Sequence, residues 1–562
     1  MRTNPALRMS LAIVAALGVA VMGTMLASAS SPRFFDDDPI WSEPATQDAS
    51  AMKPSEIGLF VDLAYNIARG GSVASIGRAR NVNTVDEVPD STWFTNRAGL
   101  RALTPEDVAV GPDTTDGPAS GPWTVTSSKS DGVTPGFTIK DASGQRWFLK
   151  FDPRGYRAMA TGTEVAVTKL MWALGYNVPQ NHIASLRAEQ LVVGEGAMFT
   201  PYGGKRRAMR ANDIGDLLKR ANQEPDGSYR VVASRALPGK PVGRVRFYGT
   251  RSDDPNDIVA HENRRELRGY GVFAAWLNHV DAKSINSLDT LVTENGRSHV
   301  RHNLIDFGSA LGSGGVGPAD YWSGEEYLVE PAGVAKQLVG FGFSFPKWHT
   351  DPYYESPAIG RLPADNIDFD PEAWKPRVRN QAFANARLDD KFWAARKLTA
   401  LSTPLLRAAV RAGEFGDAGA EDFLVRALAQ RRDAIARAYL TAINPIADPR
   451  LADGTLTFAN AAVDADVAPA PRAYRASWWT FDNVTGETRA IAETSGRTTS
   501  IDAPAGLPVQ DGAFIKVRMS AVGSGGPSGP PTSWEQPVDA YFRLRGGEWR
   551  LVGFERMPEG QR

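Results

Sequence analysis

The segment RRELRGYGVFAAWLNHVDAKSINSLDTLVTENGRSHVRHNLIDFG, residues 264–308, decides how this chain is expected to fold. Its first part carries apolar residues at i, i+3, i+4 and i+7, which predicts an amphipathic helix: Tyr270, Phe273, Ala274 and Leu277. Two strand-like runs follow, and Asn295-Gly296 between them is the strongest short signal for a hairpin turn. The segment therefore predicts a helix, a loop over residues 279–286, a hairpin and a second loop at Asp306.

Two acidic residues and one amide occupy the loops that flank this hairpin. The run from His279 to Asn286 resembles the H-R-D-x-K-x-x-N catalytic loop of the protein-kinase-like superfamily, with Val280 where arginine is usual. Asp306-Phe307-Gly308 matches the D-F-G motif of the same superfamily. Each motif alone also fits a solvated loop aspartate, but their order and the hairpin between them favour the resemblance.

The resemblance implies a role for each of these side chains. Phosphoryl transfer needs an acceptor hydroxyl that is oriented and deprotonated, and phosphate charge that is neutralised by metal. Asp281 would be the catalytic base and Lys283 would contact the moving phosphoryl group. Asn286 and Asp306 would hold Mg²⁺, a hard cation that prefers oxygen ligands and accompanies ATP.

An upstream strand and helix supply two further candidates for ATP binding. Lys150 lies in the predicted strand Gln145–Phe151, which resembles the V-A-I-K strand of kinases. Glu164 borders the apolar face of a helix predicted over residues 160–174. The resemblance predicts an ion pair with Lys150 Nζ within about 4 Å of the Glu164 carboxylate. A snorkelling edge-strand lysine and a surface glutamate are the alternatives.

Three departures from the family pattern concern the nucleotide and the acceptor. No G-x-G-x-x-G motif is present, and residues 127–136 stand in its place with small residues that could cradle phosphate through backbone N–H groups. Phe148 replaces the small residue expected under the adenine, where it would either stack on a base or block it. No Ala-Pro-Glu motif ends the irregular stretch after Gly308, so an ordinary signalling kinase is not expected.

Length and composition set broad limits. The chain has 562 residues, with 42% hydrophobic and 23% charged residues, enough for two to four globular domains. The formal net charge of −1 offers no bulk electrostatic attraction to nucleic acid, so no nucleic-acid partner is expected. The absence of cysteine excludes disulfides, thiolate metal sites and cysteine nucleophiles.

The first residues resemble a targeting segment. Arg2 and Arg8 precede an apolar run from Leu11 to Ala27, and Ala27-Ser28-Ala29 resembles a cleavage site. We therefore expect residues 1–29 to be a signal peptide and the protein to be exported to the periplasm or the extracellular space. The alternative is an uncleaved anchor helix, which would be the chain's one expected link to a membrane.

The rest of the chain predicts an α+β fold with four parts. Residues 30–120 form an extension with one helix, over Pro54–Arg69, whose apolar face is Ile57, Phe60, Val61 and Tyr65. Residues 121–447 form a bilobal kinase-like domain, β-rich over 121–240 and helical over 241–447. Residues 465–562 form a C-terminal antiparallel β-sandwich, expected to have its own core and few contacts with the cleft.

Two smaller features are expected to be structural. Trp478, Trp479 and Trp549 are interpreted as core and cross-strand packing, with a sugar-binding platform as the alternative. Arg244, Arg246 and Arg251 are interpreted as a solvated basic loop.

The combined expectation is an exported, atypical kinase, most like divergent secretory or spore-coat-type kinases. It would transfer the γ-phosphoryl group of ATP to a hydroxyl of a protein or small molecule. The alternative is a pseudokinase, with the same fold serving as a binding or scaffolding module of the cell envelope. A carbohydrate-binding envelope protein is a third possibility, and it depends on the C-terminal tryptophans alone.

Overall fold

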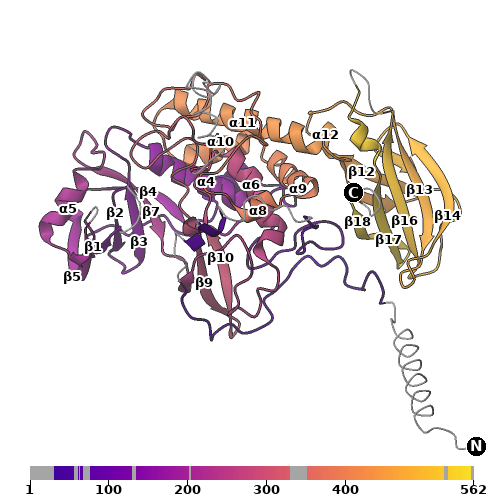
Figure 1. Cartoon of the computed structure of the whole chain (residues 1–562), viewed down its shortest axis with the longest axis horizontal. Coiled ribbons are helices and arrows are strands. Elements are labelled where there is room, and N and C mark those ends of the chain that lie inside the picture. The colour runs from indigo at the N-terminus through magenta and orange to yellow at the C-terminus, as the bar shows by residue number, and fades with distance from the viewer. Residues whose placement is uncertain are drawn as a thin grey trace, which may run out of the picture.

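The computed structural model is an α+β protein with one large mixed sheet and several antiparallel sheets. Figure 1 shows a strand-rich lobe at one end, helices in the centre and a separate group of strands at the other end. The structure describes residues 31–55, 61–62, 64–66, 76–129, 134–201, 204–328, 351–523 and 529–557. The predicted signal peptide lies outside these residues. Within them, no helix combines the length and apolar character that crossing a membrane requires.

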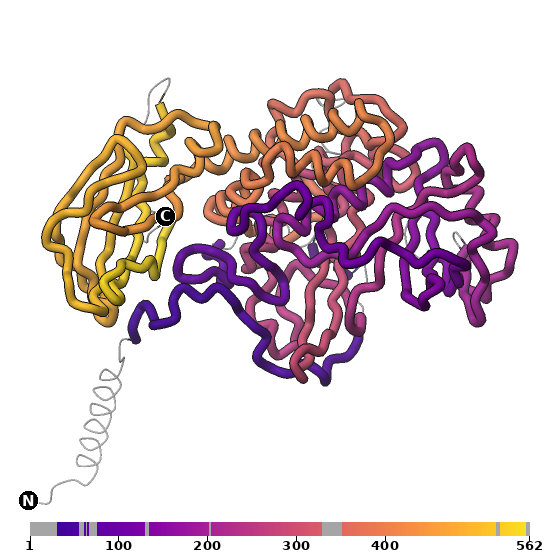
Figure 2. The backbone as a smooth tube through the Cα atoms, turned by 180° about the vertical axis from the view of Figure 1, so that it is seen from behind, coloured from indigo at the N-terminus to yellow at the C-terminus, as the bar shows by residue number. Residues whose placement is uncertain are grey.

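The N-terminal extension connects parts of the molecule that are far apart in sequence. Figure 2 shows it running from the C-terminal strands, past the β9–β10 hairpin, toward the strand-rich lobe. Phe34 packs with its ring centroid 5.1 Å from that of Tyr541, and Ala49 N donates to Ser298 O at 2.8 Å. Of the predicted apolar helix face, Tyr65 is half-buried and its ring centroid lies 3.8 Å from that of Tyr248, whereas Val61 is 68% exposed. Asp62 is buried instead and bonds the Ser284 hydroxyl, and Ile57 and Phe60 lie outside the described residues.

A seven-stranded mixed sheet forms the strand-rich lobe. Its order is β4-β7-β3-β2-β1-β5-β6, antiparallel except for the parallel β1–β5 pair. The strands are β1 Trp123–Ser128, β2 Gly136–Lys140, β3 Arg146–Phe151, β4 Asn181–Leu186, β5 Leu191–Phe199, β6 Arg207–Ala208 and β7 Tyr229–Arg235. Helix α5, Ala211–Leu218, packs against β5, and helix α4, Met159–Leu174, packs against β4 and β7. Strands β4 and β5 follow each other closely in the chain, and the turn Ala188–Gln190 separates them.

The predicted hairpin is present between β9, Ser287–Glu294, and β10, Arg297–Leu304. Asn295 and Gly296 have φ values of 52° and 76°, the left-handed conformations that a tight hairpin turn requires. Strand β8, Lys240–Gly243, extends this pair to three strands. Because the hairpin is antiparallel, the start of β9 and the end of β10 meet, and Ile305 N donates to Asn286 O at 3.0 Å.

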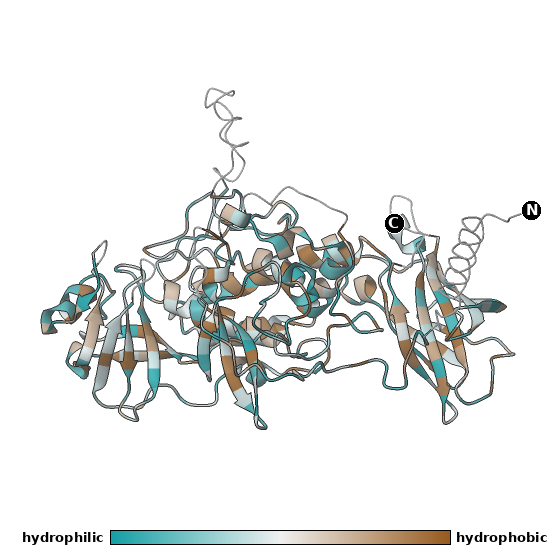
Figure 3. Ribbon diagram, turned by 60° about the horizontal axis from the view of Figure 1, so that its bottom comes forward, coloured by the Kyte–Doolittle hydropathy of each residue, from teal (hydrophilic) through white to brown (hydrophobic). Residues whose placement is uncertain are grey.

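Two antiparallel sheets form the C-terminal part. The five-stranded sheet has the order β14-β13-β16-β17-β18, and the three-stranded sheet has the order β11-β12-β15. Figure 3 shows hydrophobic and hydrophilic residues alternating along these strands. The strands are β11 Ile446–Ala452, β12 Thr455–Asn460, β13 Ala473–Phe481, β14 Thr488–Gly496, β15 Ser500–Asp502, β16 Phe514–Val522, β17 Val538–Arg545 and β18 Glu548–Glu555, with the short helix α12 Ala461–Asp464 after β12.

The structure corrects the prediction of an independent C-terminal domain. Strand pairing begins at Ile446, earlier than the predicted boundary at residue 465. Trp478 is completely buried, and its Nε1 donates to Thr494 Oγ1 at 2.8 Å, so it is a core residue and no sugar platform. Its buried cluster is continuous with that of the central helices, because helix α11 leads directly into β11.

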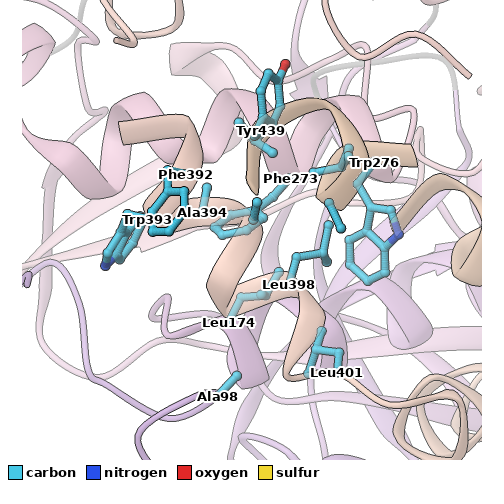
Figure 4. Close-up of a cluster of buried hydrophobic side chains, with 14 of the residues drawn as sticks. Ala98, Leu174, Phe273, Trp276, Phe392, Trp393, Ala394, Leu398, Leu401 and Tyr439 are labelled. Carbon is cyan, nitrogen blue, oxygen red and sulfur yellow. The ribbon is translucent and has the colours of Figure 1, made fainter. Parts of the chain in front are cut away.

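The central helices pack around aromatic side chains. They are α3 Pro105–Val110, α6 Arg265–Trp276, α8 Gln381–Ala384, α9 Leu388–Thr399, α10 Thr403–Ala412 and α11 Ala418–Leu440. Figure 4 shows Phe273 and Trp276 of α6 beside Phe392 and Leu398 of α9, with Leu174 at the end of α4. The helix predicted from the apolar stripe Tyr270 to Leu277 is therefore confirmed as α6, and the region 241–447 is rich in helices as expected.

The basic segment after β8 is not the solvated loop that was predicted. Arg244 donates to the carbonyl oxygen of Ile285, and the Arg251 guanidinium lies 3.4 Å from Asp289 and 3.0 Å from Asp253. Both arginines are half-buried, while Arg246 is exposed. The segment therefore supports the loop that carries Asp281, through contacts between residues far apart in the chain.

A buried charge network joins the N-terminal extension to the helices. The completely buried Arg265 lies 2.9 Å from Asp86 and 3.0 Å from Asp390, and Asp86 also lies 2.7 Å from Arg78. Burial alone would raise the pKa of Asp86, but Arg265, Arg78 and Arg556 outweigh it and lower the pKa from 3.8 to about 2. Asp86 is therefore ionised across the physiological range.

We expect Asp86→Asn to destabilise the fold by about 3 kcal/mol, because it removes one partner of a buried ion pair. Asparagine also adopts a positive φ such as the 65° of this residue, so the loss of stability measures the removal of the charge and not backbone strain. In the wild type, the ionised Asp86 carboxylate contributes roughly 2 kcal/mol of folding stability above about pH 4, and this contribution is lost as pH falls toward 2. The stability of the variant lacks this pH dependence. Urea unfolding at pH 7 measures the first effect, and unfolding at pH 3, where about half of the pH-dependent 2 kcal/mol is lost, measures the second. Asp502→Asn, at an exposed position on β15, is the control, and equal midpoints for the two variants would contradict the prediction.

Candidate active site

Lys150 lies on the face of β3 opposite the buried one. Trp147, Leu149 and Phe151 alternate into the core of the sheet, so Phe148 and Lys150 point to the other face. Lys150 Nζ lies 2.9 Å from Glu164 Oε2 and 2.9 Å from Asp306 Oδ1. Burial would lower the pKa of Lys150, but the two carboxylates outweigh it and hold the pKa above its usual range. The expected ion pair is present, and Asp306 joins it.

Glu164 connects helix α4 to the loop after β10. Its side chain is 1% exposed, Oε1 accepts a hydrogen bond from Phe307 N at 3.1 Å, and Oε2 accepts one from Gly308 N at 2.9 Å. A Cβ atom at Gly308 would lie only 3.0 Å from Oε2, so the glycine permits this approach. The alternative of a surface glutamate is therefore wrong, and Glu164 fixes both Lys150 and the Asp-Phe-Gly backbone.

Helix α4 is itself held in position by a buried carboxylate. Asp152 accepts hydrogen bonds from Ala158 N at 2.9 Å, Ala160 N at 3.0 Å and Thr161 N at 2.9 Å. These are N–H groups of the first turn, which have no partner within a helix. Asp152 thus satisfies the start of α4 and places Glu164 toward the cleft.

Asp306 carries a charge that faces two lysines. Its φ of 64° is a left-handed conformation, uncommon for a residue other than glycine. Burial would raise the pKa of Asp306, but Lys150 and Lys129 outweigh it and hold the pKa far below its usual range. The carboxylate is therefore ionised and its side chain remains 36% exposed, as a metal ligand requires.

The loop at Asp281 forms a second charged cluster. Asp281 Oδ1 lies 2.6 Å from Lys283 Nζ, and Asp281 Oδ2 accepts a hydrogen bond from Asn286 Nδ2 at 3.0 Å. Burial would raise the pKa of Asp281, but Lys283 and Asn286 outweigh it and the pKa lies below the usual value. Asp281 is therefore ionised at neutral pH, the state in which a carboxylate accepts a proton.

His279 packs between the two loops. It is completely buried, and its ring centroid lies 5.6 Å from that of Phe307 and 6.3 Å from that of Tyr270. Among the described residues, neither ring nitrogen has a hydrogen-bond partner. Burial lowers the pKa of His279 to about 4, so the ring is neutral. Val280, where the resemblance leads one to expect arginine, is also buried, so it adds packing to a loop that Arg244 supports at Ile285.

Asn286 and Asp306 meet at one end of the hairpin, since Ile305 N bonds Asn286 O. An amide oxygen and an ionised carboxylate suit Mg²⁺, which keeps several waters and takes substrate phosphates as further ligands. Within the part of the chain that the structure describes, no group of three or more His, Asp or Glu side chains could hold a metal by itself. The two residues could therefore supply two of the oxygen ligands of a Mg²⁺ ion.

Two residues of this site were not identified from the sequence. Lys129, at the end of β1, is close enough to lower the pKa of Asp306. Asn181, on β4, donates from Nδ2 to Thr168 Oγ1 at 2.8 Å and lies 3.5 Å from Glu164 Oε1. No local pattern marks Asn181. Lys129 belongs to the stretch 127–136 that replaces the glycine-rich loop, of which residues 130–133 lie outside the described residues.

We expect Glu164→Gln to release the backbone at Phe307 and Gly308. A neutral amide accepts hydrogen bonds less strongly than a carboxylate, by about 1 kcal/mol per bond, and Lys150 loses one of its two charged partners. Hydrogen exchange at the two amides should become about tenfold faster. Glu189→Gln, at an exposed glutamate of the same lobe, is the control. Unchanged exchange in Glu164→Gln would show that the carboxylate does not hold this loop.

Comparisons with known proteins find two kinases of low similarity among the solved structures. No family model matches the chain, and no curated protein matches it. Among solved structures, the Helicobacter pylori proinflammatory kinase CtkA aligns at 12% identity over 53% of this chain and 92% of its own, with a TM-score of 0.25. The Golgi casein kinase aligns at 10% identity over 71% of this chain and 94% of its own, with a TM-score of 0.30. Both TM-scores are too low to establish the fold or the activity of this chain.

Proposed function

We propose that this chain is an exported, atypical kinase with a bilobal kinase-like fold, which transfers the γ-phosphoryl group of ATP to a hydroxyl. One observation carries the proposal: Lys150, Glu164 and Asp306 converge within hydrogen-bonding distance from β3, α4 and the loop after β10. Of these contacts, Lys150 to Asp306 spans 156 residues of sequence, so local structure alone does not explain it. Export to the periplasm or extracellular space rests on the sequence of residues 1–29.

The charges of the site supply the roles that phosphoryl transfer needs. Lys150, held by Glu164, would bind phosphate oxygens of ATP, and Lys283 would neutralise charge on the phosphoryl group as it moves. Asp281, ionised and oriented by Asn286, would accept the proton of the acceptor hydroxyl. Asn286 and Asp306 would hold Mg²⁺, which neutralises phosphate charge when it is bound with ATP.

A pseudokinase-type binding module of the envelope is the second candidate, and Phe148 is the observation that favours it. Phe148 is 44% exposed on the face of β3 that also carries Lys150. A large ring there either stacks on the base of a nucleotide or fills the space that the base needs. Only the first arrangement permits ATP-dependent transfer.

Calorimetry of the purified protein with Mg-ATP tests the first step, and phosphate transfer to a panel of protein and small-molecule hydroxyls tests the second. We expect saturable binding that depends on Mg²⁺ or Mn²⁺, followed by transfer. Binding without transfer across the panel would favour the pseudokinase. Absence of binding in wild type would reject the kinase and favour the binding module, and binding regained in a Phe148→Ala variant would show that this ring fills the space of the base.

A further inference from the structure

A cavity of about 560 Å³ lies where four segments of the chain meet, outside the site described above. The extension contributes Arg97, and the link after β7 contributes Arg235 to Pro238. The end of α4 contributes Trp172, and the turn that follows contributes Tyr176, Asn177 and Val178. Strand β10 contributes Arg301 and Asn303. Its walls therefore come from the strand-rich lobe, from α4 and from the hairpin, which are neighbours in Figure 1.

The lining of the cavity is positively charged. It includes three arginines, Arg97, Arg235 and Arg301, and no aspartate or glutamate. Arg301 is partly neutralised, because its guanidinium lies 2.7 Å from Glu294. Among the ion pairs of the described residues, none joins Arg97 or Arg235 to a carboxylate within 4 Å, and Asp90 acts on Arg97 only at longer range.

Arg97 is held rigidly against the cavity wall. Its Nη1 donates to Trp172 O at 2.8 Å, and its Cζ lies 4.8 Å from the Trp172 ring centroid. Burial, reinforced by Arg101, lowers the pKa of Arg97 to about 10. Asp90, the carboxylate that opposes this shift, is already bonded by Asn96 through its backbone and its side chain. Arg97 is half-buried, and a partly desolvated guanidinium whose bonds go to carbonyl groups is stabilised by an anion.

Arg235 is oriented toward the same cavity by weak contacts only. Its Nη1 lies 3.3 Å from Thr114 Oγ1 and 3.4 Å from Gln180 Oε1, both neutral acceptors at long distance. These contacts leave most of the planar donor edge of the guanidinium available. Arginine donors of this geometry match the oxygens of a phosphate group in pairs.

We propose that this cavity binds a small phosphate-bearing molecule, with the phosphate between Arg97 and Arg235 and the remainder against Trp172 and Asn303. Free phosphate and a phosphate monoester share the recognised group. A cavity of about 560 Å³ exceeds what phosphate alone fills, so the monoester is expected to bind more tightly. The site is separate from the proposed transfer site and does not require that function.

An occupant would connect both lobes of the molecule. Asn177 Nδ2 donates to His302 O at 3.1 Å, and Leu304 N donates to Asn177 O at 2.9 Å. The turn after α4 is thus already joined to β10, and β10 leads to Asp306. Binding between Arg235 and this turn should therefore slow hydrogen exchange at Val178 and in the link over residues 236–237.

Calorimetry with inorganic phosphate and with ribose 5-phosphate tests the proposal. We expect ribose 5-phosphate to bind more tightly, and both Arg97→Gln and Arg235→Gln to weaken it about tenfold or more. Arg450→Gln, at an exposed arginine on β11, should bind as wild type. Arg235→Gln keeps the test valid if Arg97→Gln fails to fold, because Arg235 makes only long contacts.

Lys150→Gln separates this cavity from the candidate active site. Binding that persists in Lys150→Gln and weakens in Arg235→Gln supports the proposal. Binding that is lost in Lys150→Gln and unchanged in Arg235→Gln would place the probe in the cleft and overturn it. Absence of heat with either probe up to about 10 mM would also overturn it, whatever the result with ATP.

Discussion

Asp306→Ala is expected to abolish phosphate transfer and to weaken Mg-ATP binding by about 10- to 100-fold. Its carboxylate is the ionised oxygen ligand in the proposed site, in the loop after β10, and two lysines hold its pKa far below the usual range. Without it, Asn286 is the remaining candidate ligand of the proposed metal. Lys150 also loses one of two carboxylates at 2.9 Å, so it would be drawn toward Glu164 and away from the phosphates.

Calorimetry with and without Mg²⁺ and a radiolabelled transfer assay measure the two effects of Asp306→Ala. Asp216→Ala, which removes an exposed aspartate from α5, is the matched control and should leave both quantities unchanged. Asp306→Asn keeps the volume of the side chain and removes its charge, so it should resemble Asp306→Ala. Wild-type metal dependence in both Asp306 variants would show that this residue holds no metal.

Asp281→Ala is expected to lower turnover by about 10²–10⁴-fold while nucleotide affinity changes only a few-fold. Asp281 contacts Lys283 and Asn286, and no contact joins it to Lys150 or Glu164 among the described residues. It would therefore act on the acceptor hydroxyl rather than on the nucleotide. This separation of turnover from binding distinguishes a base from a metal ligand.

The control for Asp281→Ala addresses the loop itself. Removing the carboxylate leaves Lys283 and Asn286 without a shared partner, so loss of loop structure would also reduce turnover. Hydrogen exchange over residues 279–286 should remain within about threefold of wild type if the effect is chemical. Equal transfer by wild type and Asp281→Ala would reject the role of base, and no transfer by wild type would favour the binding module.

The sequence by itself determined the local elements of the segment 264–308. Apolar periodicity predicts α6, and Asn295-Gly296 predicts the hairpin because few residues tolerate the left-handed conformations of its turn. Once the hairpin is known, Asn286 and Asp306 are expected at the same end. The resemblance then indicated Lys150 and Glu164, and the ion pair between them is present.

The tertiary structure alone decided which distant residues meet. Asn181 beside Glu164, Lys129 near Asp306 and the buried Asp62 beside Ser284 carry no local signal. The C-terminal boundary moved to Ile446, and its core merged with that of the helices, for the same reason. Secondary structure depends on near neighbours, whereas burial, pKa and the cavity between Arg97 and Arg235 depend on how separate elements of the chain pack together.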